Sequence, residues 1–206
     1  MLIKKYKKIV LSFLLLIFIS FTILPHTAGY RNLKKGDFNS AIENYTTSLR
    51  LNPNNARAYF HRGFAYYSIK DYENAISDFT STINLIPYFV MAYANRGNLF
   101  SQLGDRKRAF LDYETSIQIN ETNAQMFVLR GIEYYYKRDY NNAISDFSKA
   151  IQINPYIENA YVYRGLSFFY NGEVEHALED IKSAIDLNPD DFTIKNWLSY
   201  IENTLN

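Results

Sequence analysis

The chain has 206 residues, of which 48% are hydrophobic and 21% are charged, a composition that excludes a globally disordered protein. It contains no cysteine, which excludes disulfide bonds, thiolate chemistry and cysteine-ligated zinc. Four of the 22 basic residues precede the first apolar segment, so residues 30–206 carry 18 basic and 21 acidic side chains. That negative balance lacks the basic surface that nucleic-acid binding requires, and we expect no nucleic-acid partner.

The first 24 residues have the layout of a targeting or anchoring segment. The basic stretch MLIKKYKK is followed by the uncharged, apolar residues 9–24 and then by Pro25. This order is typical of a secretory signal peptide and of an uncleaved signal anchor. We expect residues 1–24 to hold the protein at a membrane through residues 9–24, with the repeat domain on the non-cytoplasmic side. The alternative is cleavage of this segment and export or secretion of the rest.

Residues of the same kind recur every 34 positions along the rest of the chain. The ladders comprise glycine at Gly63, Gly97, Gly131 and Gly165, alanine at Ala41, Ala75, Ala109, Ala143 and Ala177, an aromatic at Tyr59, Tyr93, Phe127 and Tyr161, and proline at Pro53, Pro87, Pro155 and Pro189. A repeat of this length predicts helical units that stack on their neighbours. The small residues allow two helices to approach closely, and each proline ends a helix.

The full units follow the pattern aromatic-x-x-Arg-Gly-x-x-aromatic, then Ala-x-x-x-aromatic, then Pro, with Glu121 in place of one proline and Ile181 in place of one aromatic. This pattern resembles the tetratricopeptide repeat (TPR), with Arg where that family often has Leu. The resemblance implies an all-α protein, a right-handed α-solenoid of stacked helix-turn-helix repeats. The apolar residues 9–24 add an expected hydrophobic helix at the N-terminus. The array over residues 25–191 consists of a degenerate unit at 22–55 that overlaps the anchor, and of full units at 56–89, 90–123, 124–157 and 158–191.

The turns and the C-terminal end carry further signals. Asp71, Asp105 and Asp139 precede the second helices of their units, where we expect their side chains to accept backbone N–H groups. Residues 192–206 depart from the repeat and predict a C-terminal capping helix. Its apolar face is expected to contain Phe192, Trp197, Leu198, Ile201 and Leu205.

Two charged ladders share the 34-residue period. They consist of the arginines Arg62, Arg96, Arg130 and Arg164 and the aspartates Asp78, Asp112, Asp146 and Asp180. One interpretation is a stripe that binds phosphate or carboxylate groups. The other is a row of Arg–carboxylate pairs between packed helices, which the matched spacing favours. We therefore expect each arginine close to an aspartate of its own or the preceding unit.

In the TPR family the first helix of each unit lines a concave groove that holds a peptide. The resemblance implies such a groove here, with aromatic ends and a polar middle, formed by Phe60, Phe64, Tyr67, Asn98, Ser101, Gln102, Val128, Ile132, Tyr135, Tyr136, Val162, Leu166, Phe169 and Tyr170. The alternative is that many of these rings only pack between adjacent first helices. The lining predicts an uncharged, partly apolar peptide. Only Asn98 matches the Lys, Asn and Arg set with which some family members clamp chaperone carboxylates.

The sequence shows no catalytic arrangement. His26, His61 and His176 are scattered without metal-ligand spacing, and the glycines follow the repeat instead of forming a phosphate loop. We therefore predict a non-catalytic protein-binding scaffold, with no cofactor, metal or small-molecule substrate, that presents its groove to a peptide segment of a partner at or across a membrane. The alternative is a structural subunit of a membrane-associated assembly that uses the convex face or the ends of the array.

Overall fold

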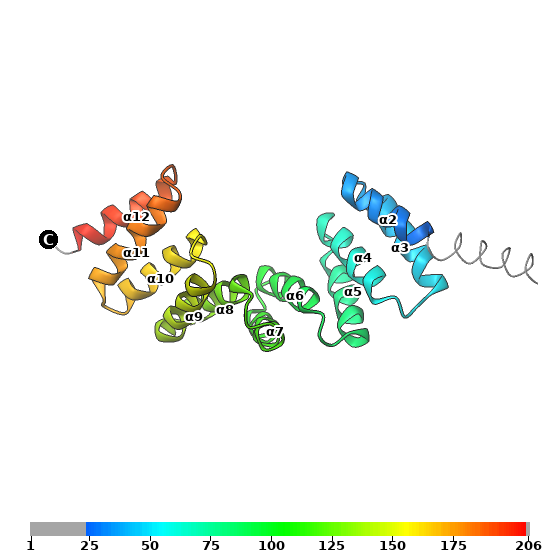
Figure 1. Ribbon diagram of the computed structural model, residues 1–206, viewed down its shortest axis with the longest axis horizontal. Coiled ribbons are helices and arrows are strands. Elements are labelled where there is room, and N and C mark those ends of the chain that lie inside the picture. Colours follow the sequence, from blue (N-terminus) through cyan, green and yellow to red (C-terminus); the bar gives the residue numbers. More distant parts are fainter. Residues whose placement is uncertain (1–23, 205–206) are drawn as a thin grey trace, which may run out of the picture. The chain divides into compact units, whose positions relative to one another are not determined.

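The computed structural model describes residues 24–204, and every regular element in this range is an α-helix. The all-α prediction is confirmed for this part of the chain, in which helical repeats are stacked (Figure 1). None of the helices within residues 24–204 has the length and apolarity that crossing a membrane requires. The expected N-terminal hydrophobic segment lies outside the described residues, apart from its last position.

Eleven helices follow one another in the described range. They are α2 (Leu24–Lys35), α3 (Phe38–Leu51), α4 (Ala56–Ser68), α5 (Tyr72–Leu85), α6 (Val90–Gln102), α7 (Arg106–Ile119), α8 (Ala124–Tyr136), α9 (Tyr140–Ile153), α10 (Glu158–Tyr170), α11 (Val174–Leu187) and α12 (Phe192–Asn203). The even-numbered helices up to α10 are the first helices of the repeats. The chain divides into two compact units, Met1–Leu99 (unit 1) and Phe100–Asn206 (unit 2), and the boundary falls within α6.

Side-chain caps fix the start of the second helices. Asp37, Asp71, Asp105 and Asp139 each accept a hydrogen bond from the backbone N–H three residues further on, which confirms the expected caps. In the last repeat Glu173 takes this place, and its side chain makes no capping bond. Each ladder proline lies two residues beyond the last residue of a second helix, because proline cannot donate the next backbone hydrogen bond.

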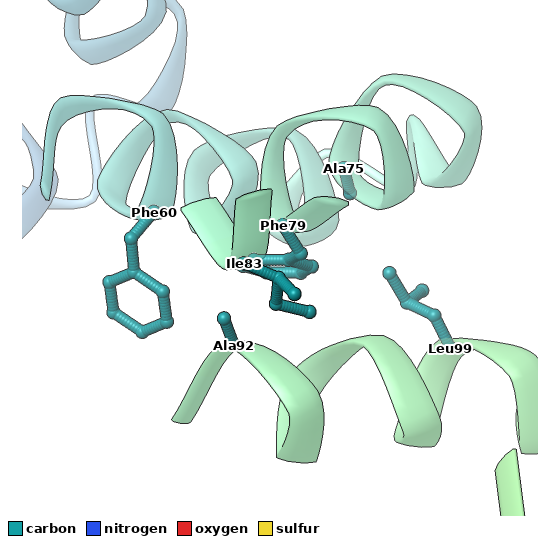
Figure 2. Packing of buried hydrophobic residues seen from close by; sticks show 6 residues of the cluster. All are labelled: Phe60, Ala75, Phe79, Ile83, Ala92 and Leu99. Carbon is teal, nitrogen blue, oxygen red and sulfur yellow. The ribbon is translucent and has the colours of Figure 1, made fainter. Parts of the chain in front are cut away.

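One of the core clusters of unit 1 joins α4, α5 and α6. Its buried members are Phe60, Ala75, Phe79, Ile83, Ala92 and Leu99. Figure 2 shows Phe79 and Ile83 of α5 directed into the space that α6 borders with Ala92 and Leu99. Phe60, which the sequence placed in the groove, is therefore a core residue, as the packing alternative expects.

The ladder glycines Gly63, Gly131 and Gly165 lie directly against the second helix of their own repeat. A Cβ atom on Gly131 would lie 2.8 Å from Cε1 of Phe147, and one on Gly63 would lie 3.0 Å from Cε1 of Phe79. Real Cβ atoms essentially never come closer than 3.0 Å to such a neighbour. In these two repeats the aromatic ring of the second helix thus packs directly on the glycine backbone of the first, whereas Gly165 faces Ile181.

The charged ladders form ion pairs next to these glycines. Arg130 donates from Nε and Nη2 to the two carboxylate oxygens of Asp146, at 2.8 and 2.7 Å. Arg62 makes the same two hydrogen bonds to Asp78, and Arg164 makes them to Asp180. The prediction of structural pairs within one repeat is confirmed for these three. The remaining ladder residues, Arg96 and Asp112, belong to unit 1 and unit 2 respectively.

A remaining nitrogen of the arginine reaches the preceding repeat. Nη1 of Arg62 donates to Oγ1 of Thr46 at 3.0 Å, and Nη1 of Arg164 donates to Oγ of Ser148 at 3.1 Å. Each of these arginines therefore joins three helices. They are the first helix that carries it, the second helix of the same repeat, and the second helix of the preceding repeat.

The last helix, α12, packs against α11 through the buried Ile194 and Ile201. The expected apolar face is correct for Ile201, with Trp197 and Leu198 partly buried beside it. It is wrong for Phe192, whose side chain is 76% exposed, because the register of α12 places Ile194 inward instead. Leu205 lies outside the described residues.

The glycine contact makes a prediction about stability. An alanine inside a helix is ordinarily favoured over glycine by about 1 kcal/mol, but Gly131→Ala forces its methyl group into the Phe147 ring. We expect the free energy of unfolding to fall by about 1–2 kcal/mol, in the range of other overpacked sites. Urea unfolding measures it. Phe147→Leu should reduce the cost of the alanine, and a gain in stability for Gly131→Ala alone would contradict the contact.

Candidate functional site

The fourteen groove candidates differ in how far solvent reaches them. Val128 is buried in unit 2, as Phe60 is in unit 1. The side chains of Phe64, Tyr67, Asn98, Gln102, Tyr136 and Tyr170 are exposed, and those of Ser101, Ile132, Tyr135, Val162 and Phe169 are partly buried. Leu166 is buried, but it lies at the wall of a cavity in unit 2.

That cavity, with a volume of about 380 Å³, opens between α8, α10 and α12. We call it the terminal pocket. It is lined by Tyr135, Tyr136, Glu158, Asn159, Val162, Tyr163, Leu166, Asp191, Thr193, Ile194 and Trp197. Four of these, Tyr135, Tyr136, Val162 and Leu166, are groove residues that the sequence predicted, and the fold brings them together.

A second cavity of about 410 Å³ adjoins the terminal pocket along α12. It is lined by Tyr170, Thr193, Asn196, Trp197 and Tyr200, so Thr193 and Trp197 border both cavities. Sequence reasoning missed the α12 residues because this helix was treated only as a cap. The repeat period indicates these residues, because Asn196 and Tyr200 lie 34 positions after the groove candidates Val162 and Leu166.

Aromatic rings follow the pocket from α8 to α12. The ring of Tyr135 lies 5.5 Å from that of Tyr163 and 6.1 Å from that of Tyr170. Phe169 lies 5.7 Å from Tyr200 on α12. Such rings supply large contact areas with few rotatable bonds, which suits them to anchoring a ligand.

The charged groups of the pocket lining are both carboxylates. Oε2 of Glu158 accepts a hydrogen bond from Nδ2 of Asn188 at 2.8 Å, and Oδ1 of Asp191 accepts one from the backbone N–H of Thr193 at 2.7 Å. Burial raises the pKa of Tyr135 to about 12 and also raises the pKa of Tyr163. These phenols are therefore neutral at neutral pH, and any negative charge in the pocket is carried by the two carboxylates.

A buried glutamate supports one wall of the pocket. Glu133 is only 1% exposed, accepts a hydrogen bond from Oγ of Ser101 at 2.6 Å and pairs with Nη1 of Arg106 at 3.2 Å. The guanidinium of Arg106 in turn lies 3.9 Å from the ring centre of Tyr136. Ser101 therefore belongs to an internal network that helps to position Tyr136. The sequence holds a signal of this burial, because Glu133 lies 34 residues after Leu99 and so occupies the equivalent position of the next repeat.

In unit 1 the fold brings together two histidines that show no metal-ligand spacing in the sequence. The rings of His26 and His61 lie 6.1 Å apart, and His61 stacks on Tyr45 at 5.7 Å. Among residues 24–204 no group of three or more potential metal ligands occurs. Burial, helped by the positive charge of Arg57, lowers the pKa of both histidines, so the pair is a neutral part of an aromatic cluster.

The histidine pair predicts a pH-dependent stability of unit 1. The pKa values of both histidines in the folded protein lie below the unfolded value of 6.5. The two neutral rings therefore contribute fully to the stability of unit 1 above pH 6.5, and this contribution is lost as the pH falls below 6.5 towards the folded-state pKa values. Urea unfolding between about pH 7.5 and about pH 5.5 should show this loss, and His61→Phe should reduce it. His176→Phe on the exposed surface of α11 is the control. An equal loss in wild type and His61→Phe would contradict the assignment.

Comparison with known proteins identifies the repeats. The family model described as TPR repeat matches residues 29–70, and the model described as tetratricopeptide repeat matches residues 56–88, 92–123 and 124–157. A search of curated proteins finds no match to the chain.

Three solved structures illustrate the similarity. MamA is 25% identical, with a TM-score of 0.76 over 82% of this chain and 92% of MamA. YrrB, described as a TPR protein with an unusual peptide-binding site, is 20% identical, with a TM-score of 0.74 over 84% of this chain and 89% of YrrB. The first TPR of Spaghetti (RPAP3), bound to the HSP90 peptide SRMEEVD, is 24% identical, with a TM-score of 0.55 over 56% of this chain and 92% of the other. On these matches and on its stacked helix pairs, the chain belongs to the tetratricopeptide repeat family.

Proposed function

We propose that this protein is a non-catalytic scaffold that holds a peptide segment of a protein partner in the terminal pocket. The observation that carries the proposal is the pair of adjoining cavities, about 380 and 410 Å³, walled by aromatic rings from α8, α10 and α12. Cavities of this size are typical of ligand sites. Buried aromatic anchors contribute a large share of the binding energy at protein interfaces.

The shape of the site favours an extended segment over a single small ligand. Two cavities that share Thr193 and Trp197 can take two side chains of one peptide. The amides of Asn159 and Asn196 line the same surface, and an amide both donates and accepts hydrogen bonds, as a peptide backbone requires.

The comparisons support peptide binding as a use of this fold. YrrB is described as having a peptide-binding site, and the RPAP3 repeat is bound to an HSP90 peptide. That peptide, SRMEEVD, is acidic, whereas the terminal pocket is lined by Glu158 and Asp191 and by no lysine or arginine. The lining therefore favours a ligand of a different kind from a chaperone C-terminus.

We further propose, from the sequence, that residues 1–24 hold the scaffold at a membrane with the repeats on the non-cytoplasmic side. Export after cleavage of this segment is the alternative. A structural subunit that works through the ends of the array remains a second candidate, favoured by the exposed Phe192 at the start of the last helix.

Peptide selection tests the site. A random peptide library is displayed on phage and selected on the full-length protein, and the tightest peptide is then synthesised and titrated. Trp197→Ala should weaken its binding by about 2 kcal/mol, roughly thirtyfold, because an aromatic anchor is lost. Since Trp197 also packs on the core of unit 2, Tyr136→Ala, with its exposed ring, serves as a second variant, and thermal unfolding is measured for both.

The matched control is Phe192→Ala, which removes an aromatic ring from the same helix outside both cavities. It should leave peptide binding unchanged. If Phe192→Ala abolishes binding while Trp197→Ala and Tyr136→Ala do not, the end of the array is the binding surface and the terminal pocket is not.

A further inference from the structure

The charge of the chain is unevenly divided between the two units. Residues 30–99 carry eight basic and five acidic side chains, a net charge of +3, whereas residues 100–206 carry ten basic and sixteen acidic ones, a net charge of −6. From 158 to 206 alone there are nine acidic and three basic residues. The negative charge of unit 2 is thus concentrated on the three helices at and beside the terminal pocket.

The two carboxylates of the pocket have no lysine or arginine partner in the described part of the chain. The ion pairs of unit 2 use other residues, such as Asp146 and Glu133. Glu158 and Asp191 instead accept hydrogen bonds from an amide and a backbone N–H. Such bonds leave most of the negative charge uncompensated, so both carboxylates attract a cation.

Two basic residues beside the pocket make contacts of their own. Arg106 lies against the ring of Tyr136 and pairs with Glu133. Lys195 of α12 lies 5.5 Å from the ring centre of Phe192, outside the cavity lining. Neither residue is among those that line the terminal pocket, so no basic side chain of this unit fills it.

The ring composition of the pocket also suits a cation. Tyr135, Tyr163 and Trp197 all line it, and the faces of Trp and Tyr rings attract ammonium and guanidinium groups. The long aliphatic stem of lysine or arginine can pack on Val162 and Leu166 while its charged end stays near the carboxylates. Aromatic rings and two carboxylates line one cavity, and they suit the apolar stem and the charged end of such a side chain.

We propose that the terminal pocket selects a lysine or arginine side chain of the partner peptide, in place of the uncharged segment expected from the sequence. The proposal rests on the function proposed above and specifies its ligand. The acidic surface of the last repeat increases the rate at which a basic segment arrives, and the pocket then holds one of its side chains.

Three fluorescently labelled peptides test the proposal. Each is a capped dodecapeptide of Gly, Ser and Ala around a central Leu-Lys-Tyr, Leu-Met-Tyr or Leu-Glu-Tyr, and each is titrated with the full-length protein by fluorescence anisotropy. We expect the lysine peptide to bind about tenfold more tightly than the methionine peptide, and the glutamate peptide to bind most weakly. Raising the salt from about 0.05 M to about 0.5 M should reduce the preference for lysine.

Conservative variants test whether the carboxylates of Glu158 and Asp191 cause the preference for lysine. Glu158→Gln and Asp191→Asn keep the side-chain volume, the acceptor for Asn188 and the capping oxygen of α12, so the fold is retained. Combined, they should remove most of the preference for lysine over methionine. Glu179→Gln, an exposed acid on α11 that does not line the pocket, removes one charge from the same repeat and should leave the preference unchanged.

The outcomes separate this proposal from the function on which it rests. If lysine and methionine peptides bind equally and Trp197→Ala weakens both, the terminal pocket binds peptides but does not select a cation, and the proposal is overturned. If no peptide binds more weakly to Trp197→Ala or Tyr136→Ala, both proposals fail. If sedimentation shows self-association that the double variant abolishes, the occupant is a second copy of this chain, and a separate partner is ruled out.

Discussion

The close approach of two helices at a glycine is the constraint on which each repeat depends. In the repeats at 56–89 and 124–157 an aromatic ring faces the glycine, and the ladder arginine and aspartate come directly before the glycine and the ring, as in Arg130–Gly131 against Asp146–Phe147. The contact that brings the backbones together therefore also buries the ion pair. Burial raises the pKa of Asp146, and the hydrogen bonds from Arg130 offset this in part.

Ladder arginines also link one repeat to the next. The bonds from Arg62 to Thr46 and from Arg164 to Ser148 tie a first helix to the second helix of the preceding repeat. In unit 2 this arrangement sets α8 and α10 side by side. Since α12 follows the last proline as the earlier first helices follow theirs, it completes the row, and the terminal pocket is the space between the three helices.

The 34-residue ladders were sufficient to predict the helical repeats, the aspartate caps and the Arg–Asp pairs, because these contacts join fixed positions in every unit. They were insufficient where a repeat departs from the pattern. The pairing of His26 with His61 and the burial of Glu133 depend on contacts between different repeats. The acidic lining was not predicted because the net charge of residues 30–206 combines +3 for residues 30–99 with −6 for residues 100–206.

The central claim is that a partner segment lies between α8, α10 and α12. Hydrogen–deuterium exchange of the full-length protein, with and without the lysine dodecapeptide, tests it most directly because each helix reports separately. The account predicts slower exchange in residues 158–170 and 192–203 and in the last turn of α8, with α4 and α5 unchanged. Protection confined to α4 and α5, or spread evenly over both units, would contradict it.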